Sequence, residues 1–442
     1  MKEVFIKVTG LVLTLFSVFY VSFITNDPTI FASALILPLL GYFILKKDFS
    51  FFLLSFLINA SFIYVFTSSY LLDTNDIFIP GGDAENFYIK IIQIASGDYT
   101  FYFGRYKLFL TIVSSYYSFL NFLSIGSSSP YHFMLLSSFF GAVGNVYILK
   151  ILRTILNNRQ SINTFLIICF FPIILKYSTG TLREIYAYPF IFIYIYNFLK
   201  IKEGKNRYLA LAMSVFFILG IRLEWVLALF SFTLFYIISG LDLVKKTKML
   251  FLIALGSIFF VFMVINFVDF IGFDGFKNYN SEKFSRIMND EDSLRSENSI
   301  ASKLMKLGVI GRIMLFFFAL ISPFPPPIIR INNSVIEPLL VSISAIYFYL
   351  NVPIIYLSIK KSLKSVKLKK ITYGFLGMII STCLLLAFTT VGSYRHKLFL
   401  FPIFLIYIPI FNNYYSNLTK KQIYGIMFFI VLVLLISYLT LK

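Results

Sequence analysis

Long apolar runs, separated by short basic segments, dominate the chain. A helix needs about 20 apolar residues to cross a bilayer, and about thirteen runs approach that length. They lie near 4–24, 30–45, 51–72, 131–151, 162–177, 184–200, 208–221, 223–240, 249–269, 336–358, 371–391, 397–411 and 423–441. The pattern predicts an all-α polytopic membrane helix bundle, with residues 1–442 forming one integral-membrane domain.

Basic residues in short loops predict which side each loop faces, because cytoplasmic loops carry an excess of Lys and Arg. The basic segments are Lys46–Lys47, Lys150–Arg159, Lys200–Arg207, Lys245–Lys248, Lys360–Lys370 and Lys420–Lys421. Placing all of them inside predicts a cytoplasmic N-terminus. No small-residue cleavage site follows the first run, so we expect a retained helix and not a signal peptide.

This topology leaves two large outer segments, near 73–130 and 270–335. Each contains an apolar stretch, 106–125 and 312–330, that would reverse the side of later basic loops if it crossed the membrane. We therefore expect membrane-associated or re-entrant helices at the outer face. The alternative is that each stretch is an ordinary span and a neighbouring span is misplaced.

Composition narrows the class of protein. Hydrophobic residues make up 59% of the chain and charged residues 13%, whereas soluble domains average about 45–50% apolar and 25% charged residues. These values exclude soluble, disordered, collagenous and disulfide-rich secreted proteins. The net charge of +19 collects on the predicted inner side, so it indicates membrane orientation and predicts no nucleic-acid partner.

The sequence predicts no metal site. It has two cysteines, both in apolar runs, and two histidines without a zinc-binding pattern. It also has no phosphate-binding glycine loop. No cofactor is therefore expected, although the sequence leaves open whether a divalent cation binds.

Arginine and lysine divide between the two predicted sides. Of eleven arginines, only Arg153, Arg159 and Arg207 fall inside, whereas lysines fill the inner loops. The planar guanidinium group of arginine suits bidentate binding of phosphate or carboxylate. The outer face is therefore predicted to bind an anion.

The first candidate site follows the Pro80–Gly82 turn signal, at Asp83-Ala84-Glu85. If a helix begins there, Asp83 lies near its N-cap, where a carboxylate often serves only to cap the backbone. The functional interpretation is a general base held at the membrane surface by a rigid helix start.

Two further outer pairs join apolar runs. Arg183 and Glu184 begin a predicted span, where ionisable residues are costly and often functional, although Arg183 could also extend to lipid head groups. Arg222 and Glu224 lie beside Trp225. They form either a structural ion pair in a tight turn or part of a substrate site.

The last cluster is Arg395-His396-Lys397, which begins an apolar run on the outer side. A single histidine is more often a packing or surface residue than a catalyst. Its position between two basic residues favours an anion site here.

With these blocks in order, the chain resembles the GT-C-type integral-membrane glycosyltransferases and the bacterial O-antigen (surface-polysaccharide repeat-unit) polymerases. The resemblance covers most of the chain from Asp83 to Pro402. It rests on Asp83…Tyr88, Phe171–Glu184, Ser322–Pro325 and Arg395–Pro402.

The resemblance implies a transferase that uses polyprenyl-linked sugars at the periplasmic face of the bacterial inner membrane, in lipopolysaccharide biosynthesis. Asp83 would then be catalytic, and Arg183 and Arg395 would contact the lipid phosphate. The predicted substrate-binding set is Arg183, Glu184, Arg222, Arg395, His396, Lys397, Tyr88 and Arg105. The expected partners are a polyprenyl-diphosphate-linked donor and acceptor, the bilayer, and other polysaccharide-assembly proteins.

The chain departs from the family pattern in two ways. The family's acid usually follows the first span, whereas Asp83 follows the third. Many members have adjacent acids, whereas Ala84 separates Asp83 from Glu85, which leaves open which carboxylate acts. Two alternatives to a polymerase stay open, a GT-C single-sugar transferase with a polyprenyl-phosphate sugar donor and a flippase for lipid-linked oligosaccharides.

Overall fold

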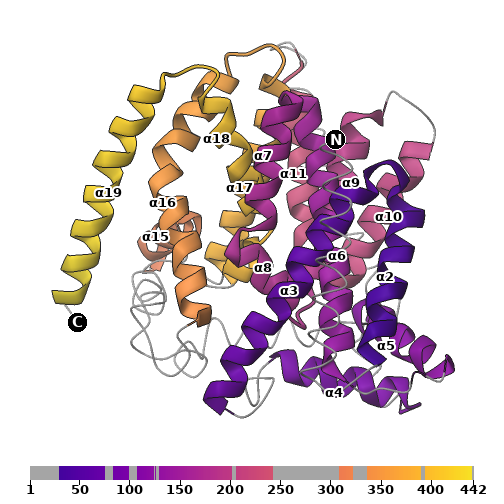
Figure 1. The fold of residues 1–442 in the computed structure, drawn as a ribbon. Helices are drawn as coiled ribbons and strands as arrows, with labels where there is room; N and C mark the ends of the chain where they lie inside the picture. The colour runs from indigo at the N-terminus through magenta and orange to yellow at the C-terminus, as the bar shows by residue number, and fades with distance from the viewer. Residues whose placement is uncertain are drawn as a thin grey trace.

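The computed structural model describes a bundle of helices (Figure 1). The described residues are 29–74, 83–98, 107–123, 125, 129–201, 206–241, 308–321, 336–389 and 394–440. They contain helices, turns and short connections but no strand. The prediction of an all-α fold is confirmed for this part of the chain.

Fifteen α-helices and two short 3-10 helices are described. The α-helices are α2 (Thr29–Leu45), α3 (Phe49–Thr74), α4 (Asp83–Ala95), α5 (Lys107–Phe122), α6 (Pro130–Ile155), α7 (Asn158–Cys169), α8 (Pro172–Thr179), α9 (Glu184–Leu199), α10 (Asn206–Ile221), α11 (Glu224–Ile238), α15 (Gly308–Ile321), α16 (Ile336–Ser362), α17 (Lys369–Thr389), α18 (Leu400–Phe411) and α19 (Asn417–Thr440). The 3-10 helices are η1 (Lys46–Asp48) and η4 (Tyr394–Lys397).

Four described segments are long and apolar enough to cross a membrane, or five if the bent pair α7 and α8 forms one span. They are Thr29–Ile63, Pro130–Ile155, Leu339–Ser362 and Lys369–Leu386. Shorter apolar helices cover Arg207–Ile221, Glu224–Ile238 and Leu400–Phe411. The predicted spans near 4–24 and 249–269 lie outside the described residues, so the expected total of about thirteen stays a prediction.

The predicted span 162–177 is wrong as a single helix. The chain breaks between Cys169 and Pro172, and α7 and α8 meet at an angle of 58°. Pro172 is at the start of α8, where its missing N–H costs no hydrogen bond, whereas inside a helix it would remove one.

The first described segment, Thr29–Ile63, contains a chain reversal. Lys46 has a positive φ of 21°, and η1 joins α2 to α3 at this point. A Cβ on Gly41 would lie within 2.5 Å of the Phe52 ring, so the absence of a side chain lets the two helices meet closely. α2 and α3 therefore form an antiparallel pair.

α4 and α5 lie at the end of the bundle opposite the α2–α3 turn (Figure 1). α4 has an apolar face that packs against the core through Phe87, Ile91 and Ile94. The ring of Phe87 contacts that of Phe109 in α5, with centroids 5.2 Å apart. Neither helix is among those long and apolar enough to cross a membrane.

α11 and α17 pack against each other at two glycines. A Cβ on Gly374 would meet the ring of Phe232, and a Cβ on Gly377 would lie 2.7 Å from the backbone oxygen of Ser231. Small residues allow helix backbones to approach closely in this way. The contact joins the helix that follows Arg222 to the helix that precedes η4.

Candidate functional site

Asp83 and Arg395 meet although 312 positions separate them in sequence. Asp83 is the first residue of α4, and Arg395 lies in η4, just before α18. Arg395 Nη1 donates to Asp83 Oδ2 at 2.5 Å. The Asp83 side chain is 56% exposed and that of Arg395 34% exposed, so an incoming solute can reach both groups.

A second ion pair, between Glu184 and Arg222, is buried. Glu184 begins α9, and Arg222 follows α10. The Arg222 guanidinium donates to Glu184 Oε1, and the two side chains are 3% and 2% exposed. Among the described residues, Glu184 Oε2 and Arg222 Nε have no hydrogen-bond partner. The buried pair therefore retains one acceptor and one donor that can each form a further hydrogen bond.

Arg222 also holds η4. Its Nη2 donates to His396 Nδ1 at 2.6 Å, and Trp225 Nε1 donates to the backbone oxygen of His396 at 3.0 Å. Burial, together with the nearby Arg222 and Arg395 charges, lowers the pKa of His396 well below its usual range. The ring is therefore neutral near pH 7, with Nδ1 as the acceptor and the proton on Nε2.

Further contacts bring the two ion pairs into one site. Thr181 Oγ1 donates to the backbone oxygen of Ala84 at 3.3 Å, which ties the start of α4 to the segment before α9. Arg395 lies close enough to Glu184 to interact electrostatically. Asp83, Arg395, Glu184, Arg222 and His396 thus form one cluster at the α4 end of the bundle.

The remaining predicted residues take different positions. Arg183 precedes α9 and interacts electrostatically with Glu184 and Glu224. Lys397 is buried, with its Nζ 5.8 Å from the centroid of the Phe401 ring, so it does not reach solvent as Arg395 does.

In α4, Glu85 comes two residues after Asp83, so the helix turns the two carboxylates away from each other. Tyr88 packs partly buried against the core. Arg105, the Pro80–Gly82 turn and the Ser322–Pro325 block lie outside the described residues.

Sequence reasoning missed the buried partner of Arg222 and the proximity of Lys176 to Arg395. The predicted ion pair between Arg222 and Glu224 is confirmed, with the charged atoms 3.6 Å apart and the Glu224 side chain 41% exposed, but Arg222 has a second, buried partner in Glu184. Lys176, in the last turn of α8, interacts electrostatically with Arg395. The sequence signal that could have identified Lys176 is a charged residue inside the apolar run between Pro172 and Arg183.

The described residues contain no group of three His, Cys, Asp or Glu side chains that could hold a metal ion. The side chains of the cluster offer carboxylates, guanidinium groups and a neutral imidazole. No protein-family model matches the chain, and a comparison with curated proteins also gives no match.

Proposed function

We propose that this chain is a membrane glycosyltransferase that acts at the outer face of the bacterial inner membrane on polyprenyl-diphosphate-linked sugars. Within that class, we propose that it polymerises O-antigen or related surface-polysaccharide repeat units. The observation that carries the proposal is the accessible contact between Asp83 and Arg395, beside the buried cluster of Glu184, Arg222 and His396.

The proposed reaction needs one base and one anion-binding group. The acceptor hydroxyl oxygen forms a bond to the anomeric carbon, and the bond from that carbon to the diphosphate oxygen breaks. The hydroxyl proton passes to the Asp83 carboxylate. Negative charge develops on the departing lipid diphosphate, and a preorganised guanidinium group stabilises it.

Arg395 serves both partners of this reaction in turn. Before the donor binds, it neutralises Asp83 through the 2.5 Å contact. A diphosphate carries more charge and offers a bidentate acceptor, so it competes for the same guanidinium group. Donor binding then releases Asp83 to accept the hydroxyl proton, which links base activation to the presence of the leaving group.

The buried pair of Glu184 and Arg222 holds Arg395 in position. Arg222 binds Glu184 from α9 and His396 from η4, so it fixes the segment that carries Arg395. Precise placement of reacting groups accounts for a large share of enzymatic rate enhancement. Glu184 and Arg222 are therefore assigned to positioning, with Arg183 as a second contact for phosphate.

The distribution of charge supports an enzyme over a flippase. Flippases and other transporters need a polar path through the membrane midplane. In the described apolar helices, the Asp, Glu, Lys and Arg side chains lie within two turns of a helix end, as at Lys150, Glu184 and Lys360. A single-sugar transferase shares this chemistry and differs only in the size of the glycan transferred.

The deciding experiment compares Asp83→Asn with Asp98→Asn, a control in the exposed turn after α4. Asn keeps the size of Asp and can still cap a helix, but it cannot accept the proton. We expect Asp83→Asn to lower transfer from a purified lipid-linked donor by at least about a hundredfold, with Asp98→Asn close to wild type. Both proteins should be monodisperse.

Normal transfer by Asp83→Asn would contradict the assignment of Asp83 and shift it to Glu85. Transfer by neither wild type nor any variant, across donors, would contradict the transferase itself. A deletion strain separates the two enzymes: single repeat units on the surface indicate a polymerase, and truncated units indicate a single-sugar transferase.

A further inference from the structure

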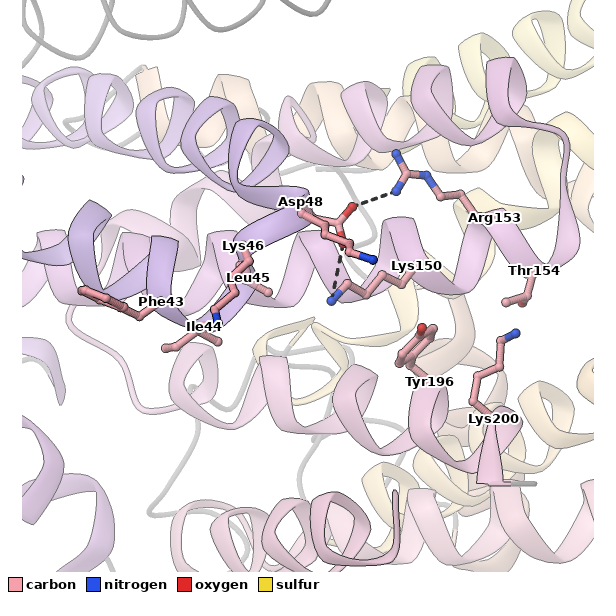
Figure 2. A pocket seen from close by; sticks show the side chains of 11 residues that line it. Phe43, Ile44, Leu45, Lys46, Asp48, Lys150, Arg153, Thr154, Tyr196 and Lys200 are labelled. Carbon is pink, nitrogen blue, oxygen red and sulfur yellow. Dashed lines mark hydrogen bonds and ion pairs between the residues drawn. The ribbon is translucent and has the colours of Figure 1, made fainter. Parts of the chain in front are cut away.

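A cavity of about 550 Å³ lies at the end of the bundle opposite α4 (Figure 1), and Figure 2 shows the side chains that line it. Four elements form its walls: the end of α2, η1, the end of α6 and the end of α9. The proposed transferase reaction uses none of its residues. It therefore calls for an explanation of its own.

Positive charge dominates the lining. Five cationic side chains face one carboxylate, that of Asp48; the cations are Lys46, Lys47, Lys150, Arg153 and Lys200. Asp48 accepts a hydrogen bond from Arg153 at 2.8 Å and lies 3.6 Å from Lys150 Nζ, as the dashed lines in Figure 2 mark. One acid cannot balance these groups, so the cavity attracts an anion.

The cavity continues into an apolar surface. Phe43 and Ile44 line the cavity, and these two residues are 69% and 56% exposed. Leu39, one turn earlier on α2, is 60% exposed. A cationic cavity next to an exposed apolar helix face matches a ligand with an anionic head and a hydrocarbon tail.

Tyr196 adds an aromatic wall to the cavity on the α9 side, between Lys150 and Lys200 (Figure 2). The cationic groups of Lys150 and Arg207 lie 5.8 Å and 5.3 Å from the centroid of its ring. Tyrosine is enriched at the level of lipid head groups, where one end of its ring system is apolar and the other is wet. The cavity therefore has the features of a membrane interface.

We propose that this cavity binds the phosphate head group of an anionic phospholipid, with an acyl chain along the exposed face of α2. Basic pockets between helices on the cytoplasmic side recognise such head groups, and each nearby Lys or Arg strengthens binding. The predicted sidedness of Lys46–Lys47 and Lys150–Arg159 places the cavity in the cytoplasmic leaflet, where a lipid would hold the ends of α2, α6 and α9 together.

The test uses full-length protein released from vesicles of phosphatidylglycerol and phosphatidylcholine, and it counts retained lipids by native mass spectrometry. The variant is Lys46→Gln/Lys47→Gln, which leaves the Asp48 ion pairs intact. The matched control is Lys360→Gln/Lys361→Gln, an exposed pair in the last turn of α16. Lys200→Gln tests the opposite wall with a single change.

We expect wild type and control to retain phosphatidylglycerol in preference to phosphatidylcholine, and the cavity variant to bind it at least about tenfold more weakly. Lys200→Gln should weaken retention in the same direction. Unchanged retention in the cavity variant, or equal loss in the control, would overturn the proposal. Inorganic phosphate that stabilises the detergent-purified protein as much as phosphatidylglycerol would assign the cavity to free phosphate and overturn the lipid assignment.

Discussion

The two ion pairs of the candidate site differ in their exposure to solvent. Glu184 and Arg222 are almost completely buried, whereas Asp83 and Arg395 are 56% and 34% exposed. A buried charge that loses its partner is strongly destabilising. A surface pair contributes about 0–1 kcal/mol because water and salt screen it.

Under the proposed function, this difference separates a positioning role for the buried pair from a chemical role for the exposed pair. The Asp83–Arg395 contact adds little to stability, so its two groups can separate without cost to the fold. The Glu184–Arg222 contact cannot open in this way. The proposed site therefore combines an exposed pair whose partners can be exchanged with a buried pair that stays closed.

The largest expected effect is on stability, in Glu184→Gln. The change keeps the shape of the side chain but removes the buried counter-charge of Arg222, which leaves only the partly exposed Glu224 carboxylate 3.6 Å away. We expect the free energy of unfolding in detergent to fall by about 3–5 kcal/mol.

Glu224→Gln is the control for that measurement, because Glu224 also contacts Arg222 but is 41% exposed. Its free energy of unfolding should change by less than about 1 kcal/mol. Equal losses in the two variants would contradict the distinction between the buried and the exposed contacts.

Next in size is the effect of Arg395→Lys on turnover. Lysine keeps the charge but loses the planar fork that a diphosphate accepts. We expect turnover of a lipid-linked donor to fall by about tenfold or more, while the free energy of unfolding changes by less than about 1 kcal/mol. Near-normal turnover would indicate that charge alone suffices and would favour Arg183 as the phosphate contact.

A smaller effect is expected from pH. Because the pKa of His396 is lowered in the folded protein, the unfolded chain, with a histidine pKa near 6.5, binds a proton that the folded protein does not. Stability is therefore fully present above about pH 6.5 and decreases as the pH falls below it. Between pH 7.5 and 5.5, the loss should be about 1 kcal/mol.

The control for the pH effect is His396→Gln, whose amide oxygen can still accept from Arg222. Unfolding curves of this variant should lose the dependence, while His132 remains in both proteins. A pH dependence that persists unchanged would exclude His396 as its source.

The smallest perturbation tests which side of the membrane each region faces. Ser96→Cys lies in the exposed turn after α4, and Val366→Cys is at a position that is 96% exposed. Both native cysteines are buried. We expect a membrane-impermeant maleimide to label the first in intact cells and the second only in inverted vesicles, and labelling from one side would contradict the predicted topology.

Sequence reasoning predicted the helices well where apolar runs end at charged residues. The predicted spans 131–151 and 184–200 correspond to α6 and α9, although α6 continues to Ile155, past the charged residues at which the apolar run ends. The bend before Pro172 was missed, since a proline can begin a helix as readily as interrupt one.

The candidate site was less predictable from sequence. Asp83 and Arg395 were assigned to one site through a family resemblance, and the structure brings them into contact. The Glu184–Arg222 pair depends on how α9 packs beside α10, and spacing along the chain carries no information on it. Sequence proximity favoured Glu224 instead, which is the weaker contact.

The close approach at Gly374 and Gly377 extends the site beyond the residues that would touch substrate. α11 begins two residues after Arg222, and α17 precedes η4 in the chain, so the packing of these two helices joins the chain segments that carry Arg222 and Arg395. A bulkier residue at Gly377 would push against the backbone of Ser231 and strain the packing of α11 on α17. We therefore expect genetic screens for inactive yet fully inserted protein to recover substitutions of these glycines alongside substitutions of the charged residues.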